Sequence, residues 1–384
     1  MARASIKTGI ARALSWTGAG SMVGALAAPR DIPLIFAYHR IVDDYAALAG
    51  RSLPAMMTSG RMLERHLDWL GRRFRFVSLS ELGSRLESGR RFEKPVAAVT
   101  IDDGYADTYH HAFPILKRKG VPAAVFAVTD AVGTSRPPAY DRLYLLLQQA
   151  ASEGPAAGRA LSVDLAALDL PLPPLQGRGE GPLDPFMAMR RLLEALPQAG
   201  LQQVIAALEA RFALDQAALA PLRPLTWEML SEMHRAGFTI GSHTRSHALL
   251  TNEALETVID ETAISRRILE SRLGIKVEHF AYPDGRFDAA TVKAVAAAGY
   301  RFGYGSCRHR DLRYPRLTIP RQFLWEQSCL DARGEFSPEI MACHARWLFD
   351  LVSGCMRDHA GRPREAAGTG GPGLAAAPPD LRGA

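Results

Sequence analysis

The sequence contains few cysteines and no long hydrophobic run, and each absence narrows the classes of protein that it can encode. Its four cysteines lie in the last quarter of 384 residues without a C-x-x-C pair, which argues against a disulfide framework and a zinc ribbon. We predict buried free thiols in a reducing compartment. No segment offers about 18 uninterrupted apolar residues, which argues against an integral transmembrane helix. The cysteines are Cys307, Cys329, Cys343 and Cys355.

No charge sign dominates the chain. Its 46 Lys and Arg against 40 Asp and Glu give a formal net charge of +6, and the basic residues are spread along the sequence. This pattern suits solubility or an anionic partner and lacks the concentrated basic stripe of nucleic-acid-binding proteins. We therefore expect no nucleic-acid partner. A content of 47% hydrophobic and 22% charged residues is ordinary for a globular protein.

The first 32 residues lack the compact apolar stretch of a secretory signal. Ile6, Ile10, Ala13 and Leu14 fall at helical spacing with basic residues between them, which favours an amphipathic surface helix. We therefore expect a protein in the cytoplasm or peripheral to the inner membrane, in preference to the periplasm.

From residue 33 the chain alternates short apolar runs with amphipathic stretches, which predicts an α/β fold with a mainly parallel sheet. Gly237, Gly274 and Gly299 stand where three of the helices should end. The expected strands are residues 34–39, 96–102, 123–128, 238–243, 279–283, 300–305 and 317–321. The expected helices include residues 61–72, 79–88, 105–119, 226–236, 252–273 and 287–298.

The alternation breaks between residues 134 and 225, where a helical stretch, a proline- and glycine-rich connector and two further amphipathic helices follow one another. A structureless loop of this length would be unusual inside a compact domain, so we predict an inserted helical segment. The expected organisation is an N-terminal amphipathic segment (1–32), a main domain (33–330) interrupted by the insertion (134–225), a C-terminal helix (331–360) and a disordered tail (361–384).

Two adjacent carboxylates, Asp102 and Asp103, follow the predicted strand 96–102 in "TIDDGY" (100–105). Burying them unpaired is costly, and each disfavours ionisation of the other, so a positive partner is expected. His243 and His247 in "SHTRSH" (242–247) end another predicted strand. Two imidazoles and one carboxylate make a three-ligand site with a position open for water, as a catalytic divalent metal requires. Asp103 would then hold the metal, and Asp102 would take a proton from water beside it.

These two motifs, followed by "FAYPDG" (280–285), resemble the first three motifs of the NodB-type polysaccharide deacetylases, carbohydrate esterase family four. The resemblance covers roughly residues 33–325 without the insertion. It implies a deformed (β/α) barrel and metal-dependent hydrolysis of N-acetyl groups on a sugar polymer. "YDRLYLLL" (140–147) is similar to a stretch in exopolysaccharide-type members; Tyr140 and Tyr144 could stack on sugars there, although two residues four apart on a helix more often pack in a core.

The resemblance also implies roles for individual residues. Asp102 matches the general base. Asp103, His243 and His247 match the ligands of a divalent metal, zinc in most members, with cobalt or nickel as alternatives. The main-chain amide of Tyr282 matches the donor that helps to hold the oxyanion, a role that a preorganised N–H can fill.

Two parts of the family pattern are missing. The arginine that usually orients the base is replaced by Phe280. Arg321 is one candidate to supply that charge, and we also class Arg321 and Pro283 as candidate substrate-binding residues. The family's late histidine, the general acid, has no match near His344 or His359, and His39 after the first strand is the expected substitute because its ordinary pKa suits proton transfer.

The sequence therefore predicts a metal-dependent hydrolase that removes N-acetyl groups from a bacterial surface or extracellular polysaccharide or from its precursor, with an N-acetylated polysaccharide or lipid-linked oligosaccharide as partner. Two alternatives stay open. The same fold could act on another C–N bond of a small molecule, or the chain could be a non-catalytic carbohydrate-binding member of a polysaccharide biosynthesis system.

Overall fold

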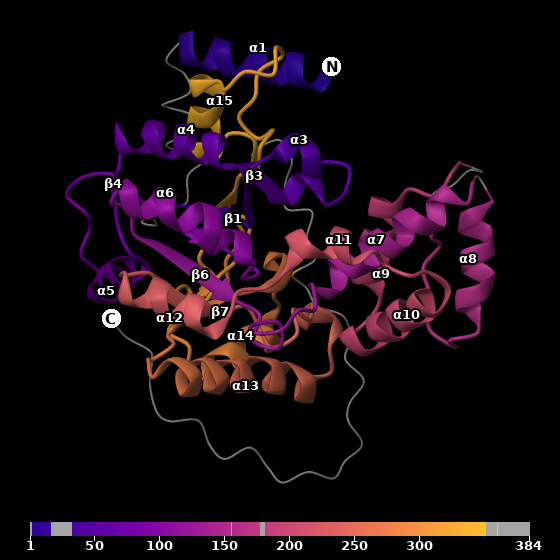
Figure 1. Cartoon of the computed structure of the whole chain (residues 1–384). Coiled ribbons are helices and arrows are strands. Elements are labelled where there is room, and N and C mark those ends of the chain that lie inside the picture. Colours follow the sequence, from indigo (N-terminus) through magenta and orange to yellow (C-terminus); the bar gives the residue numbers. More distant parts are fainter. Residues whose placement is uncertain (1, 17–32, 155, 177–180, 351–358, 360–384) are drawn as a thin grey trace.

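The computed structural model describes residues 2–16, 33–154, 156–176, 181–350 and 359. The tail for which we predicted disorder, residues 361–384, lies outside the described residues, as does Cys355. Within the described part the chain forms an α/β barrel, a helical insertion beside it and a pair of terminal helices above it (Figure 1).

A curled, eight-stranded parallel sheet forms the centre of the barrel, in the order β10-β1-β5-β6-β7-β8-β9 with β4 paired to β5. Strands β1, β5 and β6 are buried on both faces, which explains their unbroken apolar sequences. The strands of the sheet are β1 (Leu34–Tyr38), β4 (Arg75–Phe76), β5 (Val96–Ile101), β6 (Ala123–Ala127), β7 (Thr239–Ser242), β8 (His279–Ala281), β9 (Phe302–Tyr304) and β10 (Gln322–Phe323), and a separate pair is β2 (Arg40–Val42) and β3 (Met57–Ser59).

One segment joins the two ends of the sheet. Ile319 pairs with Tyr304 of β9, and three residues later Gln322 pairs with Phe36 of β1. The predicted strand 317–321 is therefore a short bridge that continues into β10. This connection curls the sheet into the deformed (β/α) barrel that we expected.

Helices cover the outside of the sheet (Figure 1), and their caps agree with the sequence signals. Thr226 caps its helix by accepting from the Met229 amide at 3.3 Å, and Gly274 ends another with φ 66°. The covering helices are α4 (Gly60–Gly71), α5 (Leu79–Ser88), α6 (Phe113–Arg118) after a π-turn at Thr108–Ala112, α12 (Trp227–Arg235), α13 (Leu255–Leu273) and α14 (Ala289–Ala297), and a short helix α3 (Tyr45–Leu48) precedes them.

The insertion folds as a helical group with a leucine-rich core of its own at one side of the barrel (Figure 1). Two barrel residues, Leu53 and Tyr105, belong to that core, so the insertion is packed against the barrel. Its helices are α7 (Ala139–Ser152), α8 (Ala157–Ala166), α9 (Pro185–Ala195), α10 (Gln198–Arg211) and α11 (Gln216–Leu219).

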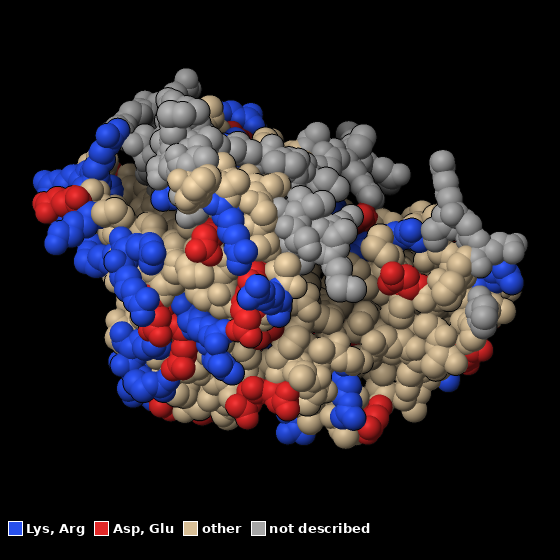
Figure 2. All heavy atoms as spheres, turned by 90° about the horizontal axis from the view of Figure 1, so that it is seen from above, with Lys and Arg blue, Asp and Glu red and all other residues tan. Residues whose placement is uncertain are grey.

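The N-terminal helix α1 (Ala2–Trp16) packs against α15 (Pro338–Ala345), with Ala11 buried against Ile340 and Cys343. Among the described residues, Cys307, Cys329 and Cys343 are buried and form no disulfide, in agreement with the prediction. Among the described helices, none combines the length and apolarity needed to cross a membrane. Lys and Arg side chains, interspersed with Asp and Glu, gather on the barrel side of the molecule, whereas the insertion side shows fewer (Figure 2).

Candidate functional site

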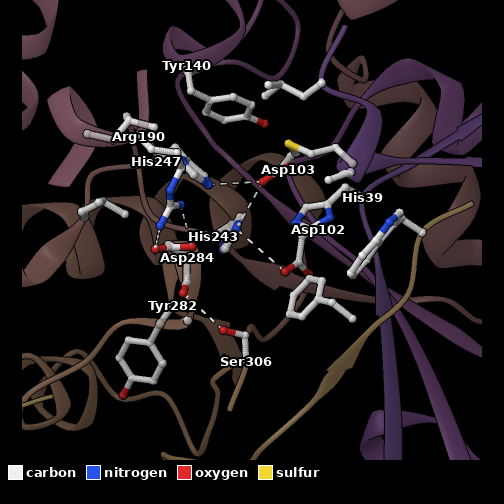
Figure 3. A pocket seen from close by; sticks show the side chains of 18 of the residues that line it. His39, Asp102, Asp103, Tyr140, Arg190, His243, His247, Tyr282, Asp284 and Ser306 are labelled. Carbon is white, nitrogen blue, oxygen red and sulfur yellow. Dashed lines mark hydrogen bonds and ion pairs between the residues drawn. The ribbon is translucent and has the colours of Figure 1, made fainter. Parts of the chain in front are cut away.

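A pocket of about 500 Å³ opens at the carboxyl ends of the barrel strands (Figure 3). Ligands of parallel α/β sheets bind at this edge because the loops after the strands converge there. Strand-end residues His39, Asp102, Asp103, His243 and His247 line the pocket, and helices α7 and α9 of the insertion form part of its wall. The pocket therefore contains every residue that we predicted for proton transfer and metal binding. The Tyr282 amide, which we predicted to hold the oxyanion, is treated below.

The predicted metal ligands converge in space. Asp103, His243 and His247 each offer a ligand atom, and these atoms lie within 4.8 Å of one another. Nε2 of both histidines is 3.3 Å from Asp103 Oδ1, yet neither buried carboxylate oxygen accepts a hydrogen bond of good geometry from the described residues. These three groups face a common point, and the carboxylate oxygens lack hydrogen bonds there. This arrangement fits a cation between them.

The backbone explains how two neighbouring carboxylates take separate partners. Asp103 has φ 71°, in the left-handed region, so the chain turns sharply after Asp102. Asp102 continues the line of β5, and its main-chain N–H donates to Tyr38 O at 2.9 Å. His247 is also left-handed, with φ 64°, and its N–H donates to Thr244 Oγ1 at 2.9 Å. Such strained positions in non-glycine residues gather at functional sites.

Electrostatics favour an ionised Asp103. Burial would raise the pKa of Asp103, but the imidazoles of His243 and His247 hold it well below its usual value. Burial lowers the pKa of His243, and Asp103 with Asp102 raises it further than burial lowers it. His243 Nδ1 lies 2.8 Å from Ala281 O; because a carbonyl can only accept, Nδ1 carries the hydrogen and Nε2 presents its lone pair to the site.

Arg321 supplies the charge that Phe280 cannot. Its NH1 and NH2 donate to the two oxygens of Asp102, each at 2.7 Å, and NH1 also donates to Thr100 Oγ1 at 3.0 Å. Phe280 is fully buried among aromatic rings. Arg321 is 1% exposed and does not line the pocket, so the structure gives it an orienting contact with Asp102 in place of the substrate contact that we predicted.

His39 lies on the pocket wall just beyond β1. Its ring stacks on Phe323 of β10 with centroids 4.8 Å apart. Burial lowers the pKa of His39, and the nearby Asp103 and Asp102 act in the opposite direction. The imidazole is thus held beside the carboxylates on a rigid strand end. Of the alternative positions, His344 also lines the pocket, but it is buried and its Nε2 lies 3.0 Å from Ser328 O. His359 lies against Phe287.

The prediction for the Tyr282 amide is wrong in this structure. Its N–H donates to Tyr304 O at 3.0 Å, as part of the pairing between β8 and β9, and a donor already used there cannot hold an oxyanion. The Tyr282 residue does line the pocket. Pro283 is buried in the turn after β8 and is not one of the residues that line the pocket, and its substrate contact stays a prediction.

The insertion contributes pocket residues that sequence analysis missed. Phe186, Met189 and Leu193 recur at helical spacing on α9 and present an apolar face to the pocket. That spacing was visible in the sequence, but nothing in the sequence showed where the face points. Of the two tyrosines that the sequence analysis did name, Tyr140 of α7 lines the pocket, whereas Tyr144, one turn later, belongs to the edge of the insertion core.

An ion network ties α9 to the loop of the third motif. Arg190 NH1 lies 3.3 Å from Asp284 Oδ1, and Arg190 NH2 donates to Glu194 Oε1 at 2.7 Å. Arg286 donates to both acids, each at 2.9 Å. Asp284 has φ 52° and, like Arg190, lines the pocket. The network links the insertion to the edge of the barrel that carries the pocket, and Figure 3 shows its contact between Arg190 and Asp284.

Comparison with known proteins identifies relatives of this chain. A family model described as polysaccharide deacetylase matches residues 89–158 and 186–303. YxkH of Bacillus subtilis (strain 168), named as a polysaccharide deacetylase, is 20% identical over 276 residues, which are 72% of this chain and 64% of that protein. The chain therefore spans less than two thirds of the length of this relative.

Two solved structures share the fold. The deacetylase PplD of Streptococcus pyogenes, solved in complex with acetate, has a TM-score of 0.51 at 17% identity, covering 82% of this chain and 97% of that chain. IcaB of Ammonifex degensii has a TM-score of 0.50 at 17% identity, with the same two coverages. At such identity the likeness establishes the architecture, a curled parallel sheet within a ring of helices.

Proposed function

The chain belongs to the polysaccharide deacetylase family, and from this premise we propose that it is a metal-dependent hydrolase that removes N-acetyl groups from a bacterial surface or extracellular polysaccharide or from its precursor. The observation that carries the proposal is the convergence of Asp103, His243 and His247 beside Asp102, in a pocket large enough for a sugar residue. Asp102 is the one carboxylate of the pair that a basic side chain orients.

One carboxylate and two neutral imidazoles suit zinc, with cobalt or nickel as alternatives. A divalent cation held by Asp103, His243 and His247 would supply a Lewis acid that polarises the acetyl carbonyl and makes a water molecule more acidic.

Asp102 accepts a proton from the attacking water. Its two oxygens each receive one hydrogen bond from Arg321, which leaves further lone pairs for a water molecule, since a carboxylate has about four acceptor positions. The bidentate contact fixes the plane of the carboxylate. Arg321 is therefore a positioning residue that acts through Asp102.

His39 donates a proton to the sugar nitrogen as the C–N bond breaks. The nitrogen of an amide is a poor leaving group until it is protonated, so the reaction requires an acid on the side of the departing sugar. Stacking on Phe323 keeps the imidazole on the pocket wall. Acetate and a free amino sugar are the products.

Acetate release from a substrate panel tests the proposal. We expect purified full-length protein loaded with zinc or cobalt to release acetate from N-acetylglucosamine polymers or from a lipid-linked N-acetylated sugar, and to lose that activity after chelation. Release of ammonia or another product from small cyclic amides, with none from sugars, would instead support the small-molecule alternative. Absence of turnover on every substrate, with metal bound, would support a carbohydrate-binding role.

Two variants assign the proton transfers. Asp102→Asn should lower kcat by about 10²- to 10⁴-fold because the base is lost, while zinc affinity stays unchanged because Asp102 is not a ligand. His39→Ala should lower kcat by a smaller factor. The loss should be smaller for substrates whose leaving amine is weakly basic, because such an amine departs with less help from an acid. Full activity of Asp102→Asn would overturn the mechanism, and loss of zinc from it would show that Asp102 is a ligand.

A further inference from the structure

Tyr140, from the first turn of α7, lies directly against a candidate metal ligand. Its ring centroid is 5.0 Å from that of His247, with the planes at 55°, and the tyrosine is 5% exposed. Figure 3 shows Tyr140 beside the candidate ligands, on the insertion side of the pocket. An insertion residue therefore contacts a group that the barrel provides.

The two candidate histidine ligands are held in different ways. His243 has the usual support of a ligand, a hydrogen bond from Nδ1 to the Ala281 carbonyl. His247 sits in a left-handed turn with its side chain 17% exposed, and among the described residues its ring contacts are Asp103, the His243 ring at 4.9 Å and Tyr140. Aromatic packing therefore sets the orientation of the His247 ring, whereas a hydrogen bond sets that of His243.

Tyr140 is itself fixed by a buried chain of hydrogen bonds. Its hydroxyl is 2.5 Å from that of Tyr105, and Tyr105 donates to Asp141 Oδ2 at 2.5 Å. Tyr105 has a single hydroxyl proton, which it donates to Asp141, so Tyr140 donates its own proton to Tyr105. All three residues are at most 5% exposed, so an arrangement that left any of these polar groups without a hydrogen bond would be costly.

This chain of contacts joins the insertion to the first motif. Tyr105 follows the two aspartates of "DDGY" and packs in the insertion core, with the Arg40 guanidinium over its ring at 5.1 Å. Arg40 is bound in turn by Asp107 at 2.8 Å and by Ser52 at 2.7 Å. Tyr140 therefore has one orientation set by buried groups from both the barrel and the insertion.

We propose that Tyr140 is a positioning residue for the metal ligand His247, and that the insertion, through Tyr140 and its Asp141–Tyr105 support, sets the affinity of the metal site. The proposal rests on the proposed metal site but adds a residue from outside the three motifs. It makes the insertion part of the metal centre as well as a wall of the pocket. The aromatic ring does the positioning, and the hydroxyl holds the ring in place.

Zinc affinity of the metal-free full-length protein, measured by competition with a chromophoric chelator, tests the proposal directly. Tyr140→Ala should weaken zinc binding by about 10- to 100-fold, as loss of a group that orients a ligand does. Tyr140→Phe keeps the ring but loses the hydroxyl that holds it, so it should weaken zinc binding by less than Tyr140→Ala does. Tyr144→Ala is the matched control, since Tyr144 lies one turn later on α7 and does not line the pocket, and it should leave zinc affinity unchanged.

Two further variants separate positioning from folding. Tyr140→Leu fills most of the buried volume without an aromatic ring, so it should fold and still lose affinity by about tenfold. Asp141→Leu removes the acceptor of the Tyr105 proton and should weaken zinc binding by less than Tyr140→Ala, because the ring remains but loses its support. Circular dichroism and thermal unfolding of each metal-free variant establish that it is folded.

The outcomes distinguish this inference from the proposed function. Unaltered protein that binds no zinc, cobalt or nickel would overturn the metal site itself. Unaltered protein that binds zinc, together with a folded Tyr140→Ala or Tyr140→Leu of equal affinity, would overturn the role of Tyr140 alone. Equal losses in Tyr140→Ala and Tyr144→Ala would also overturn it, since they would reflect general damage to α7.

Discussion

The barrel and the insertion enclose one pocket with different kinds of side chain. The barrel contributes charged and titratable groups at strand ends, each held by buried contacts such as that between Arg321 and Asp102. The insertion contributes mainly apolar residues, among them Phe186, Met189 and Leu193, and its sequence, residues 134–225, contains no histidine. Groups that react need a rigid support, whereas a wall that selects substrates can be built from helices that are free to vary.

The largest loss of stability should follow from breaking the buried ion pair between Arg321 and Asp102 in the barrel. Arg321→Met leaves Asp102 buried without its partner, so the free energy of unfolding should fall by about 3–5 kcal/mol. The control is Arg316→Met in the same segment, whose partner Glu87 lies 3.0 Å away at a part-exposed position; its effect should stay below about 1 kcal/mol. Chemical denaturation measures both, and similar losses would contradict the importance of burial.

A cavity in the insertion should act locally. Leu192 of α9 is fully buried in the insertion core, so Leu192→Ala should cost about 2–4 kcal/mol. Because that core is distinct from the main barrel core, hydrogen exchange should accelerate in α7, α9 and α10 while β5 and β6 stay protected. Uniform acceleration in both regions would show that they unfold as one unit.

A fall in pH should lower the stability of the elements that carry three buried histidines and raise that of the start of α7 in the insertion. Burial lowers the pKa of His66 and of His344 to about 3 and that of His279 to about 4, so the unfolded chain binds more protons and stability falls as the pH drops below 6.5. At pH 5 each histidine should cost about 2 kcal/mol. Burial raises the pKa of Asp141 to about 7; there the folded state binds more protons, and the stability that it contributes is lost as the pH rises through 7.

Hydrogen exchange at pH 5 and pH 8, corrected for the intrinsic exchange rates, measures this contrast. Protection should decrease at pH 5 around α4, β8 and α15, which carry the three histidines. Protection at the start of α7, which carries Asp141, should be retained or increase. A parallel decrease in all four elements would contradict the assignment of opposite signs.

The smallest effect concerns the ion network between the two regions. Arg190 is 32% exposed on its side chain and contacts Asp284 and Glu194, so Arg190→Gln should change stability by less than about 1 kcal/mol. It should change KM more than kcat, because Arg190 and Asp284 line the pocket and are not among the residues that we propose for proton transfer. High salt should reduce the difference between variant and unaltered protein. A large loss of kcat would give Arg190 a catalytic role.

Sequence reasoning succeeded for the groups that stand at the ends of recognisable strands. Asp102 and Asp103 end a strand whose apolar run is unmistakable, and the parallel sheet brings the ends of β5 and β7 to one edge, so their meeting with His243 and His247 could be foreseen. Phe280 showed that an arginine was missing, and Arg321 could be suggested because it follows another predicted strand. The convergence of the ligands needed only strand order and strand direction.

Other features required the three-dimensional arrangement. Whether the Tyr282 amide is free depends on the pairing of β8 with β9, and the strand pattern does not fix that register. The face that α9 turns toward the pocket depends on the path of the connector before it. Tyr140 and Tyr144 share a helix face in the sequence, yet only Tyr140 reaches the pocket, because the position of the barrel edge decides between them.

The contact between Arg321 and Asp102 spans 219 residues of sequence, and the strand segment that carries Arg321 is the last to join the barrel. During synthesis the aspartates and histidines leave the ribosome well before their orienting arginine, so a growing chain carries the metal-binding groups before its base is oriented. Asp102 would thus gain its orienting partner only once the last strand of the barrel has been made.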